Sequence, residues 1–151
     1  RGTVEENVTM WDSESNEERT NKLLDNVGLS HLKTRSSTDS QLVLKSGGTD
    51  LSGGERQRLS IARELYRPFQ LLILDEATSA LDSELEKKID DLLREERGKA
   101  TIVVIAHRLS TIRNADIVHV LDAGRVVESG KYDELASGDT LFSRMVKSQD
   151  L

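Results

Sequence analysis

"LLILDEATSALD", at residues 71–82, joins an aliphatic run to a pair of acids. Leu71 to Leu74 are four consecutive aliphatic residues, and Asp75 and Glu76 follow them directly. An aliphatic run without polar alternation is typical of a strand buried on both faces, as in a parallel sheet. We therefore predict a buried strand that ends at two carboxylates.

Helical patterns lie on both sides of this strand. Residues 51–67 carry an apolar stripe and end before Pro68, and residues 83–97 carry a second stripe. The first stripe comprises Leu59, Ile61, Ala62 and Leu65. A further aliphatic run, "ATIVVIAH" at residues 100–107, predicts a second buried strand. Strand, helix and strand in this order predict an α/β sheet with a right-handed crossover.

The ends of the chain carry shorter patterns. Residues 15–29 predict a helix, whereas residues 1–14 show no capping signal and residues 30–49 read mostly as loop, with room for one short helix. Residues 115–130 predict a hairpin that turns at Asp122, Ala123 and Gly124. Two short helices, at 131–137 and 139–148, should close the chain.

Composition restricts the class of protein. The 151 residues are 36% hydrophobic and 32% charged, as expected for a soluble globular chain. A net charge of -6 argues weakly against a nucleic-acid-binding face, and the absence of cysteine excludes disulfides and thiolate metal sites. The longest apolar run, Ile102 to Ala106, is far shorter than the roughly 20 residues of a membrane helix. We expect a chain of cytosolic type.

The two acids suggest a magnesium–nucleotide site. One carboxylate often suffices to hold Mg²⁺, which keeps several waters, and a second can orient or deprotonate an attacking water. In α/β sheets, ligands bind beyond the carboxyl ends of the strands, so Asp75, Glu76 and His107 should converge on one rim. The alternative is that the acids only mark the exit from the core and that His107 is structural. His31 and His119 have no comparable placement, and His119, inside the hairpin pattern, is read as structural.

"DLSGGERQ", at residues 50–57, begins the first predicted helix with two glycines. Ser52 and Glu55 have the spacing of a capping box, which explains both residues structurally. Gly53 and Gly54 each cost roughly 1 kcal/mol against alanine in a helix. Open N–H groups at the positive end of a helix favour an anion, and a phosphate would account for both glycines.

The start of the second predicted helix has a structural explanation. Residues 77–84 read "ATSALDSE", in which Asp82 or Ser83 can cap the helix. Ser83 and Glu86 have the spacing of a second capping box.

Taken together, these motifs resemble the ATPases of the ABC family. "LSGGERQR" resembles their signature motif, and "LLILDEATSALD" resembles their Walker B strand with the catalytic glutamate and the D-loop. "IAHRLST" resembles the switch-histidine loop, and "DIVHVLDAGRVVESGKYDEL" the C-terminal hairpin and helix. "GTVEEN" and "HRLST" resemble exporter-type nucleotide-binding domains more than importer ones.

The resemblance implies a fold and its division. We expect a partial P-loop NTPase-like ABC ATPase fold of the α/β class. Residues 1–69 would form the helical subdomain with the signature motif, and residues 70–151 the C-terminal part of the mainly parallel ATPase core. The Walker A pattern GxxxxGK[ST] does not occur in the 151 residues. We therefore expect a truncated or partial nucleotide-binding domain. Residues 45–48 also lack the acid of the "ERG"-like loop that exporters often carry.

The resemblance also implies partners. Two nucleotide-binding domains would enclose ATP and Mg²⁺, pairing the Walker A loop of one with the signature motif of the other. Ser52, Gly53 and Gly54 would meet the γ-phosphate of ATP held by the partner domain, with Glu55 beside them. Asp82, in the D-loop, would reach across this dimer. Transmembrane domains would place the ATPase on the cytoplasmic side of the cell membrane, with no nucleic acid involved.

Three residues would carry the reaction itself. Asp75 would hold Mg²⁺ through water, Glu76 would polarise the attacking water, and His107 would contact the γ-phosphate. Without the Walker A loop, the 151 residues alone should barely bind ATP. Two other functions remain open from the sequence: a DNA-maintenance or translation ATPase with the same signature, and a non-enzymatic interaction module. The first usually carries a long coiled coil or basic linkers, and neither pattern occurs in the 151 residues.

Overall fold

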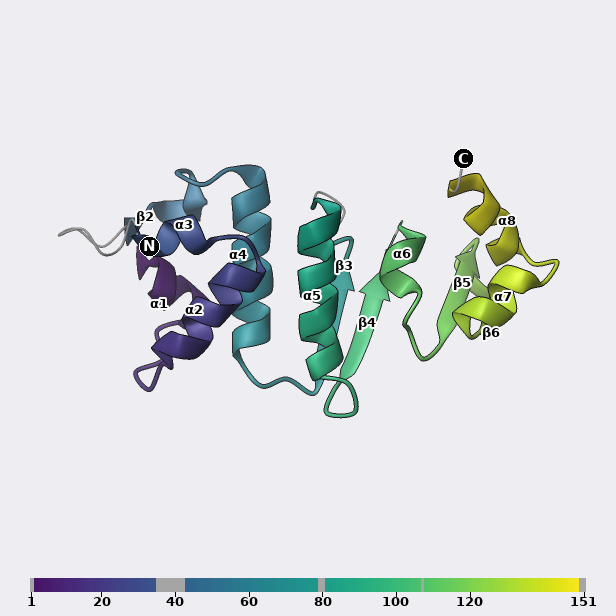
Figure 1. Ribbon diagram of the computed structural model, residues 1–151, viewed down its shortest axis with the longest axis horizontal. Coiled ribbons are helices and arrows are strands. Elements are labelled where there is room, and N and C mark those ends of the chain that lie inside the picture. Colours follow the sequence, from purple (N-terminus) through teal and green to yellow (C-terminus); the bar gives the residue numbers. More distant parts are fainter. Residues whose placement is uncertain (1, 35–42, 79–80, 107, 150–151) are drawn as a thin grey trace. The chain divides into compact units, whose positions relative to one another are not determined.

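The computed structural model describes residues 2–34, 43–78, 81–106 and 108–149 (Figure 1). The chain packs as two compact units, Arg1–Val103 and Val104–Leu151. This is a division by packing, and the boundary expected after residue 69 stays a prediction.

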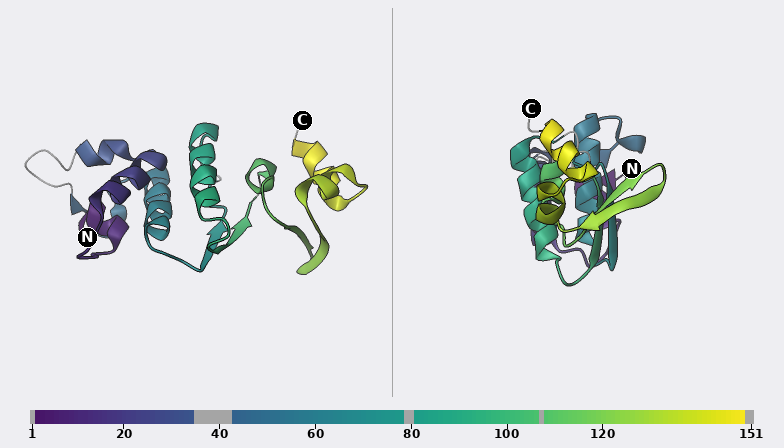
Figure 2. Two further views of the ribbon diagram at one scale, coloured as in Figure 1. Left: turned by 60° about the horizontal axis from the view of Figure 1, so that its bottom comes forward. Right: turned by 90° about the vertical axis from the view of Figure 1, so that its right-hand side faces the viewer.

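The first unit is mainly helical. Its helices are α1 (Val4–Thr9), α2 (Glu17–Asn26), α3 (Ser30–Thr34), α4 (Gly53–Tyr66) and α5 (Ser83–Glu95). α1 and α2 pack against α4 (Figure 1 and Figure 2). Arg63 of α4 donates from Nε to the Asn7 carbonyl at 2.9 Å, and the Tyr66 hydroxyl accepts from the Asn16 N–H at 2.9 Å. These contacts fix α4 within the unit.

The predicted helix at 51–67 is confirmed as α4. Its predicted apolar stripe is buried, and the helix ends at Tyr66, with Arg67 extended before Pro68. α2 is confirmed as well, and the short helix in the 30–49 stretch is α3. α1 corrects the sequence reading of residues 1–14, because Thr3 and Glu6 form a capping box at its start.

Two short strands and a turn connect the helices before α4. β1 (Gly2–Thr3) pairs antiparallel with β2 (Val43–Leu44), and the 3-10 turn η1 (Ser46–Gly48) follows. β2 and η1 lead the chain into the first turn of α4.

The strand at 71–75 is only half covered. β3 (Leu71–Asp75) lies beside β4 (Thr101–Ile105), and Figure 1 draws both arrows in the same direction. Leu72 and Leu74 are buried, but Leu71 and Ile73 are 55% and 59% exposed. The prediction of burial on both faces is therefore wrong for β3. It is also wrong for β4, in which no described residue is buried.

The physical reason is that the sequence of a strand does not determine which other segments pack on its two faces. A continuous aliphatic run is what a strand covered on both faces requires. Within the described part of the chain, only one face of β3 is covered. Alternate residues of each strand are therefore exposed and apolar: Leu71 and Ile73 in β3, and Val103 and Ile105 in β4.

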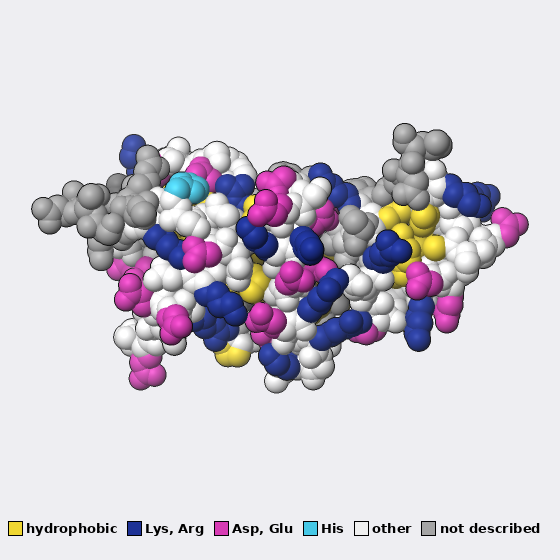
Figure 3. All heavy atoms as spheres, viewed as in Figure 1, with side chains coloured by type: hydrophobic (Ala, Val, Ile, Leu, Met, Phe, Trp, Pro, Cys, Tyr) yellow, Lys and Arg dark blue, Asp and Glu magenta, His cyan; other side chains and the backbone are white. Residues whose placement is uncertain are grey.

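α5 begins one residue earlier than its predicted capping box requires. Asp82 is the N-cap, and its Oδ1 accepts from the Leu85 N–H at 2.9 Å. Ser83 is thus inside the helix, and the predicted capping box of Ser83 with Glu86 is wrong. The outer face of α5 carries interspersed acids and bases (Figure 3), among them the Lys88–Glu84 pair at 2.9 Å. Exposed pairs of this kind contribute little stability.

The second unit is built on the predicted hairpin. β5 (Val118–Asp122) pairs antiparallel with β6 (Arg125–Gly130), and Ala123 and Gly124 turn with φ of 46° and 76°. Both residues have positive φ, as a type I′ turn requires. The helices are α6 (Leu109–Ile112), α7 (Tyr132–Ser137) and α8 (Leu141–Gln149). A small core of Leu109, Val118, Val120, Leu135 and Phe142 holds the unit together.

Among the described residues, no helix is both long and apolar enough to span a membrane.

Candidate functional site

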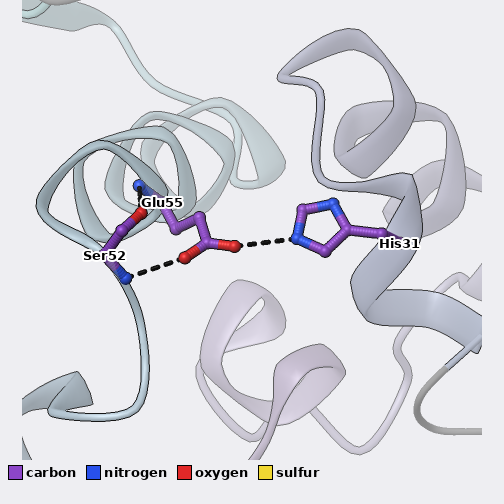
Figure 4. A network of polar contacts seen from close by, with 3 residues as sticks. All are labelled: His31, Ser52 and Glu55. Carbon is purple, nitrogen blue, oxygen red and sulfur yellow. Dashed lines mark hydrogen bonds and ion pairs between the residues drawn. The ribbon is translucent and has the colours of Figure 1, made fainter.

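The first turn of α4 is held by a reciprocal capping box, as predicted. The Ser52 hydroxyl accepts from the Glu55 N–H at 3.2 Å, and the Glu55 carboxylate accepts from the Ser52 N–H at 2.7 Å (Figure 4). Two of the N–H groups that every helix start leaves open are satisfied in this way.

The two glycines between these residues remain open. In the part of the chain that the structure describes, the N–H groups of Gly53 and Gly54 donate to no protein oxygen. A Cβ added to Gly53 would meet only the Arg56 guanidinium, at 3.9 Å. Among the described residues, no contact requires a glycine at position 53. The prediction that these glycines admit an anion to the positive helix end is compatible with this open surface.

The loop that leads into α4 is fixed by side chains. Arg56 donates from Nη1 to the carbonyls of Leu51, at 2.6 Å, and Gly48, at 3.3 Å. The Asp50 carboxylate accepts from the Lys45 N–H at 3.3 Å. The glycines therefore follow an ordered loop.

The acid pair lies next to this helix. Asp75 is the exposed last residue of β3, and Glu76 follows it with φ of 48°. Positive φ is uncommon for a residue with a side chain and marks a backbone conformation that its surroundings must hold. Gln57, in the first part of α4, donates from Nε2 to the Glu76 carbonyl at 3.5 Å. This contact joins the side chain of Gln57 in α4 to the backbone of the predicted catalytic acid.

Two further predicted site residues stand differently. Asp82 is engaged as the cap of α5, which is a structural role. His107 lies outside the described residues. The expectation that His107 shares a rim with Asp75 and Glu76 therefore stays a prediction.

His31 is the contact that the sequence reading missed. Its Nε2 lies 2.8 Å from Oε1 of Glu55 (Figure 4). The two residues are 24 positions apart, and no periodicity in the sequence connects them. Hydrogen bonds from the Ser52 backbone, from the Ser52 side chain and from His31 lower the pKa of the Glu55 carboxyl to about 2.

Comparison with known proteins decides the family. The family model described as "ABC transporter" matches residues 1–79, which include the capping box of α4, β3 and both acids. The chain belongs to the ABC transporter family. Its relatives identify a nucleotide-binding domain of exporter type.

Several ABC transporters align along most of the chain. The mycobactin import ATP-binding/permease protein IrtB of Mycolicibacterium thermoresistibile is 41% identical over 98% of this chain and 26% of its own length. P-glycoprotein 14 of Caenorhabditis elegans is 40% identical over 99% of this chain and 11% of its own. The ATP-dependent lipid A-core flippase of Francisella tularensis is 52% identical over 68% of this chain and 17% of its own.

A solved structure supports the same fold. A bacterial Atm1-family ABC exporter with ATP bound matches with a TM-score of 0.85 at 32% identity, over 99% of this chain and 26% of that chain. The chain therefore spans about a quarter or less of the ABC transporters that it matches here.

The acids of this ABC domain fit a lightly ligated cation. No group of three or more histidine, cysteine, aspartate or glutamate residues able to hold a metal occurs among the described residues. Mg²⁺ in nucleotide sites is usually held by one or two carboxylates together with water and substrate phosphates. Asp75, exposed at the end of β3, provides such a carboxylate.

The low pKa of Glu55 gives a first testable result for this ABC domain. A folded-state pKa below the ordinary value of 4.5 means that ionised Glu55 stabilises the fold above that pH. This contribution is lost as the pH falls from about 4.5 to about 2. We expect the free energy of unfolding in urea to fall more between pH 6 and pH 3 for the unaltered protein than for Glu55→Gln. Glutamine keeps the capping box but does not titrate. Equal losses for the two proteins would contradict the assignment.

Proposed function

We propose that this chain supplies the signature motif, the Walker B strand and the catalytic glutamate of an ATPase that drives transport across a membrane. The observation that carries the proposal is the capped first turn of α4, in which the Gly53 and Gly54 N–H groups donate to no protein oxygen among the described residues. The strand that ends in Asp75 and Glu76 supports the catalytic part of the proposal.

The predicted catalytic residues each have a role in phosphoryl transfer. Catalysis of that reaction rests chiefly on positioning and on neutralising charge. Asp75 would hold Mg²⁺, which when bound neutralises charge on the phosphates. Glu76 would accept a proton from, or orient, the attacking water. By family resemblance, His107 would contact the γ-phosphate.

The open N–H groups of Gly53 and Gly54 serve a different ATP. In the arrangement we propose, the Walker A loop that binds ATP belongs to a second nucleotide-binding domain, and Ser52, Gly53 and Gly54 contact the γ-phosphate across the interface. Glu55 holds the turn, and Asp82 lies in the D-loop at the same interface. Transmembrane domains would couple this dimer to transport from the cytoplasmic side.

The apolar outer face of β3 supports one further part of the proposal. Exposed Leu71 and Ile73 would be covered by the portion of the domain that carries the Walker A loop. We call the protein that includes this portion the intact protein.

The activity of the isolated chain tests this division of roles. The 151 residues contain no GxxxxGK[ST] loop, so the purified chain should show no ATPase above background, whereas the intact protein should hydrolyse ATP. Phosphate release measured on equal molar amounts of both checks this. Turnover by the isolated chain would contradict the proposal. An intact protein that binds ATP but never hydrolyses it would favour an interaction module.

A further inference from the structure

His31 contacts the residue that closes the capping box of α4. It belongs to α3, and its ring nitrogen Nε2 faces one oxygen of the Glu55 carboxylate at 2.8 Å (Figure 4). The other oxygen accepts the Ser52 N–H at 2.7 Å. Both oxygens of Glu55 are therefore used, one by the turn itself and one by a residue from another helix.

We propose that His31 is a positioning residue for ATP hydrolysis, which orients the Glu55 carboxylate and thereby the N–H groups of the signature turn. The inference rests on the proposed function. His31 donates from Nε2 either as the protonated ring or as the neutral tautomer that carries its hydrogen there.

The support for His31 is rigid. α3 is anchored by Leu29 and Leu32, both fully buried. The Asp25 carboxylate accepts from the Ser30 hydroxyl at 2.6 Å and pairs with Lys33 at 2.7 Å. α3 is thus held by contacts of residues on both sides of His31 in the sequence. These contacts place the His31 ring beside Glu55.

The contact also differs from an ordinary surface pair because it involves the carboxylate that closes the capping box of α4. The Glu55 side chain is only 20% exposed, whereas that of His31 is 50% exposed. Because Glu55 closes the capping box, a rotation of its carboxylate would remove the acceptor of the Ser52 N–H. Ser52 directly precedes Gly53 and Gly54, so its backbone sets the direction of their N–H groups. A small reorientation there changes where the N–H groups point, and hydrolysis is sensitive to such displacements.

The test compares histidine variants in the intact protein. His31→Leu removes the hydrogen bond, and His31→Gln restores a donor near the position of Nε2. His119→Leu is the matched control, because the His119 Nδ1 lies 2.7 Å from the Ser129 hydroxyl oxygen within the β5–β6 hairpin. The measurements are kcat and KM for MgATP, together with the thermal unfolding midpoint.

We expect His31→Leu to lower kcat by roughly tenfold, the scale seen when a group that orients a functional ligand is removed. KM should change less than about twofold, because the first binding of ATP is made by the Walker A loop. His31→Gln should recover most of kcat, and His119→Leu should match the unaltered protein. In a Glu55→Ala background, His31→Leu should have no further effect, since the two residues act as one unit.

Several outcomes would overturn the inference. An unaltered kcat in His31→Leu, or a loss that His31→Gln does not recover although its unfolding midpoint is unchanged, would show that the hydrogen bond does not position the turn. Additive losses in the Glu55→Ala background would show the same. If the unaltered intact protein lacks ATPase activity, the proposed function fails and this inference fails with it. An active protein with an unimpaired His31→Leu variant removes the inference alone.

Discussion

Replacing Glu76 by glutamine should reduce the ATPase rate of the intact protein by about 100-fold or more, the scale of losing a general base. Glutamine keeps the size and the hydrogen-bonding oxygen of the side chain but cannot take a proton from water. The backbone of Glu76 has a φ of 48°, and its carbonyl accepts from Gln57, contacts that glutamine at this position retains. ATP binding should therefore remain within about twofold of the unaltered protein, as expected when only a transition-state interaction is removed.

Glu84→Gln is the matched control for this variant. This substitution makes the same chemical change on the exposed first turn of α5, where the Glu84 carboxylate pairs with Lys88 at 2.9 Å. The control should hydrolyse ATP at the unaltered rate. Glu76→Gln with more than half of the unaltered rate, at normal ATP binding, would show that another group activates the water.

Replacing Gly53 by alanine should have the second large effect, a fall in ATPase of about tenfold to 100-fold, comparable to losing a phosphate-binding donor. A Cβ at this position meets only the Arg56 guanidinium at 3.9 Å, so the fold accommodates it. Alanine is also a better helix former than glycine by up to about 1 kcal/mol. The free energy of unfolding should therefore stay the same or rise slightly, while the methyl group obstructs the approach of a phosphate to the open N–H groups.

The control here is Ser60→Ala, on the exposed side of the same helix. It tests whether raising the helix propensity of α4 alters activity by itself, and it should not. Gly53→Ala with unaltered ATPase would mean that the two glycines are not a phosphate site. A lowered unfolding free energy would mean instead that position 53 requires glycine for the fold.

The helices and the hairpin were predictable because their signals are local. Periodicity places the buried stripe of α4, Ser52 and Glu55 fix its first residue, and positive φ at Ala123 and Gly124 closes the hairpin turn. The start of α5 agrees with the predicted residue 83, but its cap was left open because Asp82 and Ser83 are both good caps, and the structure shows that Asp82 is the N-cap.

Features that depend on distant packing were not predictable. An aliphatic run indicates that both faces of a strand suit apolar neighbours, but it does not show which segments pack there. The exposure of Leu71 and Ile73 could therefore be seen only in the structure. The contact of His31 with Glu55 joins residues 24 positions apart and depends on the direction of α3. The acids and the glycines of the candidate site were predicted one motif at a time. The contact of Gln57 with the Glu76 carbonyl became visible only in the folded chain.

The central claim is that the signature turn acts on ATP bound by another copy or partner domain. Mixing the two inactive variants of the intact protein, Glu76→Gln and Gly53→Ala, tests it directly. In a mixed pair, one site combines both defects, while the other takes its Glu76 from the Gly53→Ala copy and its signature turn from the Glu76→Gln copy. That site is unaltered, so ATPase should recover, to at most about a quarter of the unaltered rate when copies pair at random as a two-fold dimer. A mixture that stays as inactive as the separate variants, although mixed pairs are demonstrated, would contradict the claim.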